Sequence, residues 1–312
     1  MKRIPRYLIY LIVMIIILVA SLLLTTRTPP DKSDINVYFC RIDDCGSILE
    51  ELLANSNKSI HCAFYSISDA DILETLNEKT DVRVVVDKSE NSKFPFMKSI
   101  ESKGIMHNKF CIIDSYEVIT GSYNPTENHD ENNIVIIKSQ ELAENYEEEF
   151  QELWNAEEGK KTQNPVIKMS NITLESYFCP EDSCAEKINE KLMAANSSIY
   201  FMAYTFTHPE LATTLVLKSL KNVTVKGIME KSQNSEYSKY DLFSYQGLDV
   251  IWDNKPWLMH HKVFIIDNET VITGSFNPTK SADEDNDENV LIIHDKEIAR
   301  LFLKEFERIR GK

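Results

Sequence analysis

Hydrophobic and polar residues follow one another along this chain in an order that occurs twice. An apolar strand is predicted at 37–40 and again at 176–179, which lies 139 residues further on. Each is followed by a turn, an amphipathic helix and a second apolar strand, at 59–65 in the first copy and 198–204 in the second. The offset of these second strands is again 139 residues. We therefore interpret the chain as two copies of one unit.

The remainder of each copy repeats a second set of elements. Two helices are predicted to carry apolar residues at helical spacing: Leu142, Tyr146, Phe150 and Leu153 in the first copy, and Ile298, Phe302, Phe306 and Ile309 in the second. The other predicted elements are helices at 69–76 and 209–217, and strands at 82–86, 110–113, 118–120, 134–137, 223–228, 263–266, 271–273 and 290–293. Strands that alternate with helices predict an α/β fold, with a mixed sheet between helices in each copy.

These patterns divide the chain into five segments. We predict a membrane anchor at 1–27, a linker at 28–36, the first repeat at 37–155, a second linker at 156–171 and the second repeat at 172–312. By positions 107 and 260 the offset between the copies has grown to 153 residues, so the second repeat contains fourteen extra residues between positions 230 and 260.

The N-terminal segment contains twenty residues without a charge, Tyr7 to Thr26, rich in Leu, Ile and Val. That length suits a helix that crosses a hydrocarbon core of about 30 Å. A cleaved signal peptide is the alternative, but the apolar run is long for one and no small-x-small site follows it. Basic residues before the span outnumber those just after it, so we expect one uncleaved membrane span with the remaining chain outside the cytoplasm.

The charge of the chain bears on its substrates. The net charge is −15, and the first 27 residues contribute +4, which leaves −19 for the remainder. A body of this charge repels polyanions at long range unless a basic cleft overrides it. Composition therefore disfavours a nucleic-acid substrate without excluding it.

Two pairs of cysteines are spaced as C-x4-C at corresponding places in the copies: Cys40 with Cys45, and Cys179 with Cys184. Because disulfides persist outside the cytoplasm, we predict a bridge within each pair. Two cysteines without a neighbouring histidine are an incomplete zinc site, so no metal is expected there. Cys62 and Cys111 lie in apolar strands and are expected to be core thiols.

One motif made of candidate catalytic residues occurs in both copies, with identical spacing. It reads His-x-Lys, four residues, Asp, six residues and Gly-Ser-x-Asn. The first copy supplies His107, Lys109, Asp114, Ser122 and Asn124, and the second supplies His260, Lys262, Asp267, Ser275 and Asn277. Two complete occurrences exclude a chance match, because six positions agree each time.

These residue types suit the cleavage of a phosphodiester. A neutral imidazole attacks an anionic phosphorus without charge repulsion, and a second imidazole protonates the departing oxygen. Lys109 and Lys262 are expected to neutralise the nonbridging oxygens, which Asn124 and Asn277 would also bind. Ser122 and Ser275 are further candidates for phosphate binding. This chemistry requires no metal and no cofactor.

In these motifs the chain resembles the phospholipase D superfamily, over residues 34–310. The resemblance implies that the two repeats are related by a pseudo-two-fold axis and bring both motifs into one cleft. It also implies a carboxylate in an Asn-x-Glu-Asn pattern that hydrogen-bonds a catalytic histidine, which is Glu288 in the second copy. In the first copy Asn132 occupies that place, and only a one-residue bulge would bring Glu131 there.

The resemblance leaves several roles open. Asp114 and Asp267 are motif residues and catalytic candidates, but both end strands, where Asp commonly makes a turn, and we favour a structural role. His261 lies between a motif histidine and lysine, so its side chain is expected on the opposite face. We expect His107, supported by Glu288 from the other copy, to be the nucleophile and His260 the acid.

Our leading hypothesis is an anchored monomeric phosphodiesterase that hydrolyses phospholipids at an extracytoplasmic surface. The alternatives are a nuclease that cuts DNA or RNA, a phosphatidyl transferase and a binding module without activity. Transferases of this type usually have more hydrophobic spans, and binding modules typically lose a His or Lys, whereas both motifs here are complete.

Overall fold

The computed structural model describes residues 34–90, 92, 94–157 and 159–311. The predicted anchor at 7–26 lies outside these residues, so the fold described below does not bear on it. Within the described ranges, none of the helices combines the length and apolar character that a bilayer crossing requires.

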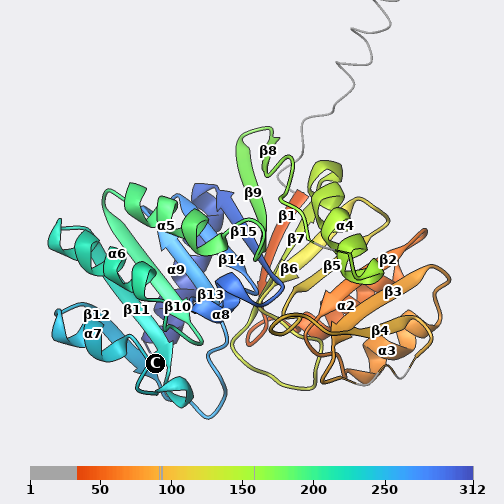
Figure 1. The fold of residues 1–312 in the computed structure, drawn as a ribbon, viewed down its shortest axis with the longest axis horizontal. Coiled ribbons are helices and arrows are strands. Elements are labelled where there is room, and N and C mark those ends of the chain that lie inside the picture. The colour runs from red at the N-terminus through yellow and green to blue at the C-terminus, as the bar shows by residue number, and fades with distance from the viewer. Residues whose placement is uncertain (1–33, 91, 93, 158, 312) are drawn as a thin grey trace, which may run out of the picture. The chain divides into compact units, whose positions relative to one another are not determined.

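The first repeat forms a mixed sheet of seven strands. The spatial order is β1-β7-β6-β5-β2-β3-β4 (Figure 1). β2, β3 and β4 run parallel to one another, and the other neighbouring pairs are antiparallel. The strands are β1 Ile35–Phe39, β2 Ile60–Phe64, β3 Val82–Asp87, β4 Met97–Ile100, β5 Lys109–Ile113, β6 Glu117–Gly121 and β7 Asn133–Lys138.

The second repeat forms a mixed sheet of eight strands, in the order β12-β11-β10-β13-β14-β15-β9-β8. Seven of these strands follow the same order as the first sheet, and β8 is added beyond β9. The strands are β8 Val166–Met169, β9 Ile172–Cys179, β10 Ser198–Ala203, β11 Thr224–Glu230, β12 Asp249–Asp253, β13 Lys262–Ile266, β14 Thr270–Gly274 and β15 Glu288–His294. The tandem α/β architecture predicted from the sequence is therefore present.

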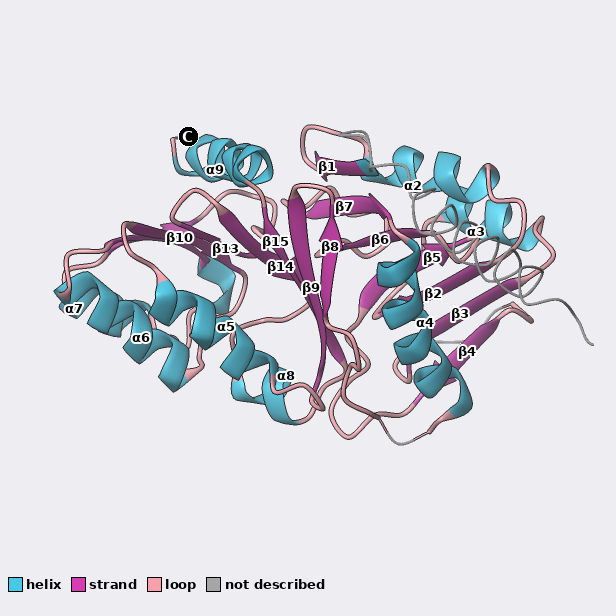
Figure 2. Cartoon of the chain, turned by 90° about the horizontal axis from the view of Figure 1, so that it is seen from above, coloured by secondary structure: helices cyan, strands magenta, loops and turns pink. Residues whose placement is uncertain are grey.

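Helices cover both faces of each sheet, as Figure 2 shows. The first sheet lies between the pair α2 and α3 and the long helix α4, and the second between the pair α5 and α6 and the long helix α9 (Figure 2). The bounds are α2 Cys45–Ala54, α3 Ala70–Asn77, α4 Gln140–Asn155, α5 Cys184–Ala194, α6 Pro209–Leu220, α7 Tyr240–Tyr245, α8 Lys280–Glu284 and α9 Lys296–Arg310. The extra residues of the second copy include the short 3-10 helix Lys231–Gln233 and α7.

The two long helices bury the apolar stripes that the sequence predicts. Leu142, Tyr146 and Phe150 of α4 are fully buried, and Phe302 and Phe306 of α9 are at most 2% exposed. All of them belong to one core that also contains residues of both sheets. Because this core is shared, each repeat completes the hydrophobic packing of the other. Each large apolar side chain that is buried stabilises the folded state by about 1.5–3 kcal/mol.

Several elements were not predicted. β4 and β12 are edge strands of four and five residues, and α7 and α8 are short helices. Elements this short contain too few residues for a period of hydrophobic positions to be recognised. β8 lies inside the segment that we interpreted as a linker, and it pairs antiparallel with β9. Here pairing with a neighbouring strand, not local sequence, produces the element.

The cysteine prediction was correct for two pairs and wrong for the third. Cys40 is bonded to Cys45, and Cys179 to Cys184, as predicted. Cys62 and Cys111 are also bonded to each other and are not core thiols. They are direct partners on the antiparallel strands β2 and β5, with a Cα–Cα distance of 4.1 Å. Strand register, which the sequence did not reveal, brings these two sulfurs together.

Candidate active site

The segments that carry the two motif histidines each form backbone hydrogen bonds with the other repeat. The backbone N–H of His107 donates to the carbonyl of Asp287 in the second repeat, at 2.9 Å. The N–H of His260 donates to the carbonyl of Glu131 in the first repeat, also at 2.9 Å. Met106 and Met259, which precede the histidines, form isolated parallel bridges with the same two segments. These reciprocal contacts bring both motifs into one site, as the resemblance implied.

Each motif lysine is the first residue of a central strand, β5 or β13, and its side chain is buried. Lys109 is 1% exposed and Lys262 3%. Each ammonium donates to the carbonyl of the histidine two residues earlier, at 2.8 Å for Lys109 and 2.7 Å for Lys262. Each Nζ therefore lies against the backbone of its motif histidine.

Two tyrosines complete this arrangement, and sequence reasoning assigned them no role. The ring of Tyr65 contacts His107 edge-on at 5.4 Å between centroids, and Tyr204 contacts His260 at 4.7 Å. The lysine Nζ atoms lie 5.7 and 5.2 Å from the same two ring centroids. Both tyrosines follow the strand next to the motif strand, 139 residues apart, and this shared position was the available signal.

The two histidines have unequal supports, and both supports come from the other repeat. The Nδ1 of His107 lies 2.8 and 2.9 Å from the two carboxylate oxygens of Glu288. The Nδ1 of His260 lies 2.8 Å from the amide oxygen of Asn132. The predicted contact between Glu288 and His107 is thus present, and Asn132, not Glu131, occupies the matching place. Glu131 instead accepts hydrogen bonds from Trp257 and Arg308.

The predicted phosphate-binding role of the two motif serines does not agree with their position. Ser122 and Ser275 have no exposed surface. The Ser122 hydroxyl donates to Asn132 at 2.9 Å, and the Ser275 hydroxyl donates to Glu288 at 2.5 Å. These hydroxyls therefore hold the groups that support the histidines, and are not free to bind a phosphate.

Glycine is required before each of these serines because β6 and β7, like β14 and β15, come very close there. A Cβ atom on Gly121 would lie 2.2 Å from the carbonyl oxygen of Asn133, and one on Gly274 would lie 2.2 Å from that of Asn289. Both glycines also have positive φ, 150° and 141°. Any side chain here would displace β7, which begins directly after Asn132, or β15, which begins with Glu288.

The motif asparagines remain available to a ligand. No hydrogen bond to the side-chain amide of Asn124 or Asn277 is found among the described residues. The amide oxygen of each is buried and has no partner there. Each side chain follows the Gly-Ser turn of its motif, consistent with the predicted contact to a phosphate.

The electrostatics of the site show that the four motif side chains act on one another. Burial lowers the pKa of His107 and of His260 well below the usual value, and the charges of Lys109 and Lys262 lower each further. Burial also lowers the pKa of Lys109 to about 7, and that of Lys262 well below its usual range. An anion would oppose every one of these shifts, so the empty site is electrostatically prepared for one.

Burial raises the pKa of Glu288, and Lys109 opposes this shift. Both carboxylate oxygens lie within hydrogen-bond distance of the same ring nitrogen, so the protonation of Glu288 and that of His107 depend on each other.

The motif aspartates do not join the site. Asp114 accepts hydrogen bonds from the backbone N–H groups of Asn57, Lys58 and Ser59, and Asp267 contacts Asn196, Ser197 and Ser198 in the same way. Although burial opposes the effect, these bonds lower the pKa of both carboxyls. Each aspartate follows the far end of the strand that begins with the motif lysine. The structure therefore places both in turns that connect strands.

His261 lies on the opposite face from the motif residues, as expected, and is completely buried. Its Nδ1 lies 3.0 Å from Asn133 and its Nε2 3.3 Å from Glu305 of α9. Of the remaining histidines without a motif partner, His61 contacts Glu147, His208 caps α6 and His294 contacts Glu175.

The fold and the site together define a class: an α/β protein with two related halves whose paired His-x-Lys motifs meet in one buried, anion-attracting centre. The family described as "Cardiolipin synthase, PLD-like domain" matches residues 49–154 and 188–310. The chain belongs to this family and thereby to the phospholipase D superfamily.

Two relatives illustrate the similarity. A phospholipase D from Rickettsia felis is 35% identical over 147 residues, which cover 45% of this chain and 74% of that protein. The human mitochondrial cardiolipin hydrolase is 36% identical over 129 residues, 41% of this chain and 51% of that protein. With the complete pair of motifs, these relatives support an enzyme that hydrolyses phosphodiester bonds.

A solved structure extends the likeness to both repeats. The phosphatidylserine synthase of Haemophilus influenzae superposes with a TM-score of 0.68 over 91% of this chain and 88% of that one. The sequence identity is 13%, so this likeness concerns the fold alone.

Proposed function

We propose that this protein hydrolyses the phosphodiester bond of phospholipid head groups at a membrane surface. The contact of Glu288 with His107 across the repeats carries the chemical part of the proposal, because it prepares one imidazole for attack. The relatives named phospholipase D and cardiolipin hydrolase support a lipid substrate. The charge of −19 outside the first 27 residues also favours a lipid over a long polyanion.

In the proposed reaction, His107 is the nucleophile. Glu288 holds a hydrogen on Nδ1, which leaves the lone pair of Nε2 free to attack phosphorus. A bond forms between Nε2 and phosphorus as the bond to the leaving oxygen breaks, and this produces a phosphohistidine. Lys109 and Lys262 balance the charge on the nonbridging oxygens, and Asn124 and Asn277 donate hydrogen bonds to them.

His260 transfers the protons in this scheme. Its low pKa in the empty site means that it takes up a proton only when the anionic substrate is bound, because the phosphate charge opposes the effect of the two lysines. It then protonates the leaving oxygen. In the second step it accepts a proton from the water that attacks the phosphohistidine, and free His107 is restored. Phosphate trapped without acid and mapped to His107 would support this assignment, whereas phosphate on His260 would reverse the two roles.

We further propose that residues 7–26 anchor the protein and that the catalytic repeats lie outside the cytoplasm. The twenty uncharged residues and the basic residues before them support the anchor and its orientation. The three cysteine pairs support an oxidising compartment. Because one chain supplies both motifs, a monomer is sufficient for activity. Protease protection on intact cells tests the orientation, and a shielded C-terminus would contradict it.

The substrate is tested by comparing labelled phospholipid vesicles with single-stranded DNA, using wild type and His107→Ala. We expect release of a free head group that depends weakly on salt and is lost in the variant. A nuclease that contacts several phosphates loses affinity steeply with added salt. Steep salt inhibition on DNA, without lipid turnover, would refute the lipid assignment in favour of a nuclease.

A further inference from the structure

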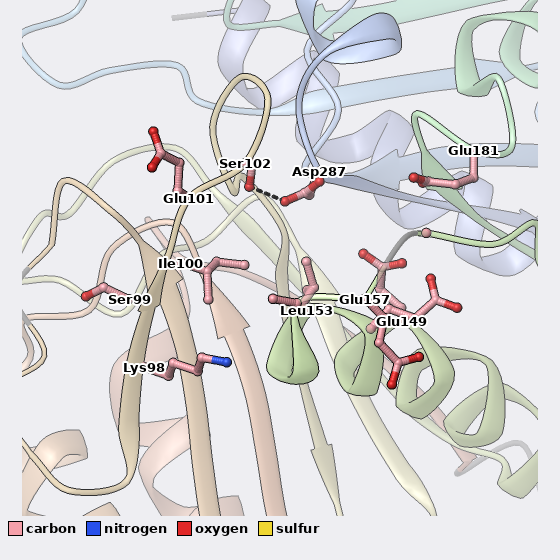
Figure 3. Close-up of a pocket in the computed structure, with 13 residues that line it drawn as sticks. Lys98, Ser99, Ile100, Glu101, Ser102, Glu149, Leu153, Glu157, Glu181 and Asp287 are labelled. Atoms are coloured by element: carbon pink, nitrogen blue, oxygen red, sulfur yellow. Dashed lines mark hydrogen bonds between the residues drawn. The ribbon is translucent and has the colours of Figure 1, made fainter.

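A cavity lies at the junction of the repeats, and none of the motif side chains lines it. Its volume is about 440 Å³, within the range of small-molecule sites. Its lining comes from β4 and the following loop, from the C-terminal half of α4, and from two segments of the second repeat that carry Glu181 and Asp287 (Figure 3). Six lining side chains are carboxylates: Glu101, Glu149, Glu152, Glu157, Glu181 and Asp287.

Three of these carboxylates have no ion-pair partner within the described part of the chain. Glu101 pairs with Lys88, and Glu152 and Glu157 pair with Lys160. The lining Lys98 donates to the carbonyl of Trp154 and not to a carboxylate. The three that remain are Glu149, Glu181 and Asp287.

Glu149 is the most informative of the three. It is 7% exposed, and one of its oxygens accepts a hydrogen bond from Asn108 at 3.0 Å. The other oxygen accepts no hydrogen bond from a described residue and keeps some accessible surface, and the side chain lines the cavity. A carboxylate buried to this extent normally has a cation or several donors beside it. Its position therefore indicates a missing cationic partner.

The pseudo-symmetric place in the second repeat contains such a partner. There the guanidinium of Arg308 on α9 donates to both oxygens of Glu305, from Nε and Nη2, at 2.6 Å each. It also donates to Glu131. Burial opposes the effect, but the hydrogen bonds from Arg308 and His261 lower the pKa of Glu305 to about 2. Both carboxylates of this cluster therefore have a cationic partner within the chain.

The first repeat keeps the acids of this cluster and lacks its cation. The matching positions lie 156 residues apart, or 153 within the motif: Glu305 with Glu149, Glu131 with Asp287, Arg308 with Glu152, and His261 with Asn108. A glutamate thus stands where the second repeat has its arginine. Burial and the neighbouring carboxylates raise the pKa of Glu149 well above its usual value, and burial raises that of Asp287 to about 6.

The spacing of the carboxylates argues against a metal ion. Among the described residues, the one group with three ligand atoms close enough for an ion is Glu131, His261 and Glu305, where Arg308 already lies. No three of the six cavity carboxylates, all of them described residues, bring oxygens within 4.8 Å of one another, and they come from several elements. An elongated ligand with separated positive groups matches this arrangement better than a compact ion.

We propose that this cavity binds a small linear organic cation with two or more ammonium or guanidinium groups. One group would lie between Glu149 and Asp287, as Arg308 lies between Glu305 and Glu131. Another would reach Glu181. The bound cation would also act on the histidine site, because the carbonyl of Asp287 holds the N–H of His107 and Asn108 lies between His107 and Lys109.

Calorimetric titration of the full chain with spermidine and with agmatine tests the proposal directly, without any measurement of activity. We expect one site with a Kd below about 1 mM and a rise in Tm on saturation. Glu181→Gln removes one carboxylate from the cavity and should weaken binding about fivefold. Glu307→Gln, on the exposed face of α9, removes the same charge elsewhere and should leave binding unchanged.

A second variant introduces into the first repeat the arginine that the second repeat has at the matching position. Glu152→Arg supplies the missing guanidinium from the chain itself, so it should abolish binding of both cations and raise Tm by about 2–4 °C. If Glu152→Arg does not fold, the titration of Glu181→Gln still tests the proposal. Binding that persists unchanged in Glu181→Gln, or that Mg²⁺ reproduces at equal ionic strength, would overturn the proposal, as would the absence of binding.

Discussion

The contact between Glu288 and His107 leads to the most specific prediction. In the change Glu288→Gln, the side chain keeps its size and loses its charge. Glu288 has no exposed surface, and both of its oxygens lie within 2.9 Å of Nδ1 of His107. The amide can also present its NH₂ group to Nδ1. The ring would then carry its hydrogen on Nε2, the atom that must attack phosphorus.

The size of the effect follows from these two consequences. A buried hydrogen bond to a charged group contributes about 1.5–3 kcal/mol, which corresponds to a roughly 10- to 150-fold change in rate. The population in the wrong tautomer lowers the rate further. We therefore expect kcat to fall by about 10²–10³-fold, while Tm stays within a few degrees because Ser275 and Asn286 can still contact the side chain.

The first repeat offers a matched control. Asn132 contacts His260 as Glu288 contacts His107, so Asn132→Asp makes the opposite change at the corresponding position. We expect it to lower kcat less than about tenfold, because His260 already functions beside an amide. Single-turnover hydrolysis of labelled phospholipid, with circular dichroism as a folding control, measures both variants. Activity of Glu288→Gln within threefold of wild type, or an equal loss in both variants, would refute the assignment of His107 as nucleophile.

Four further predictions concern the two motifs and the proposed reaction. His107→Ala combined with His260→Ala should cost little more activity than either change alone, since both act in one unit, and full additivity in kcat would contradict a shared site. Lys109 must be charged to bind phosphate and burial lowers its pKa to about 7, so kcat/KM should fall as the pH rises through 7. In Lys109→Arg this fall in kcat/KM should occur at higher pH. A fall at unchanged pH in the variant would mean that another group causes it. EDTA should leave activity intact, and loss restored by a divalent ion would disprove a metal-free reaction. Asp114→Asn should lower the free energy of unfolding by about 1–2 kcal/mol and leave kcat within threefold, whereas a large loss of kcat at normal stability would make the aspartate catalytic.

The sequence alone was sufficient for the features that depend on local order. The strands beside each motif, the stripes of α4 and α9 and the two C-x4-C bridges follow from residues close together in the chain, where period and spacing are informative. The repeat itself, at offsets of 139 and 153 residues, identified the motif residues and the phosphodiester chemistry that they suit, without any knowledge of the fold.

Tertiary structure decided which groups meet across the repeats. Glu288 reaches His107 over 181 positions, and Asn132 reaches His260 over 128, because each motif segment pairs with the other repeat. Strand register joined Cys62 to Cys111 and turned the serine hydroxyls toward the supports of the histidines. The sequence offset shows that an arginine is present in one half and absent from the other, but only the structure shows that Arg308 binds Glu305 and Glu131. Such contacts depend on the packing of distant segments, and a pattern within one segment carries no information about its partner.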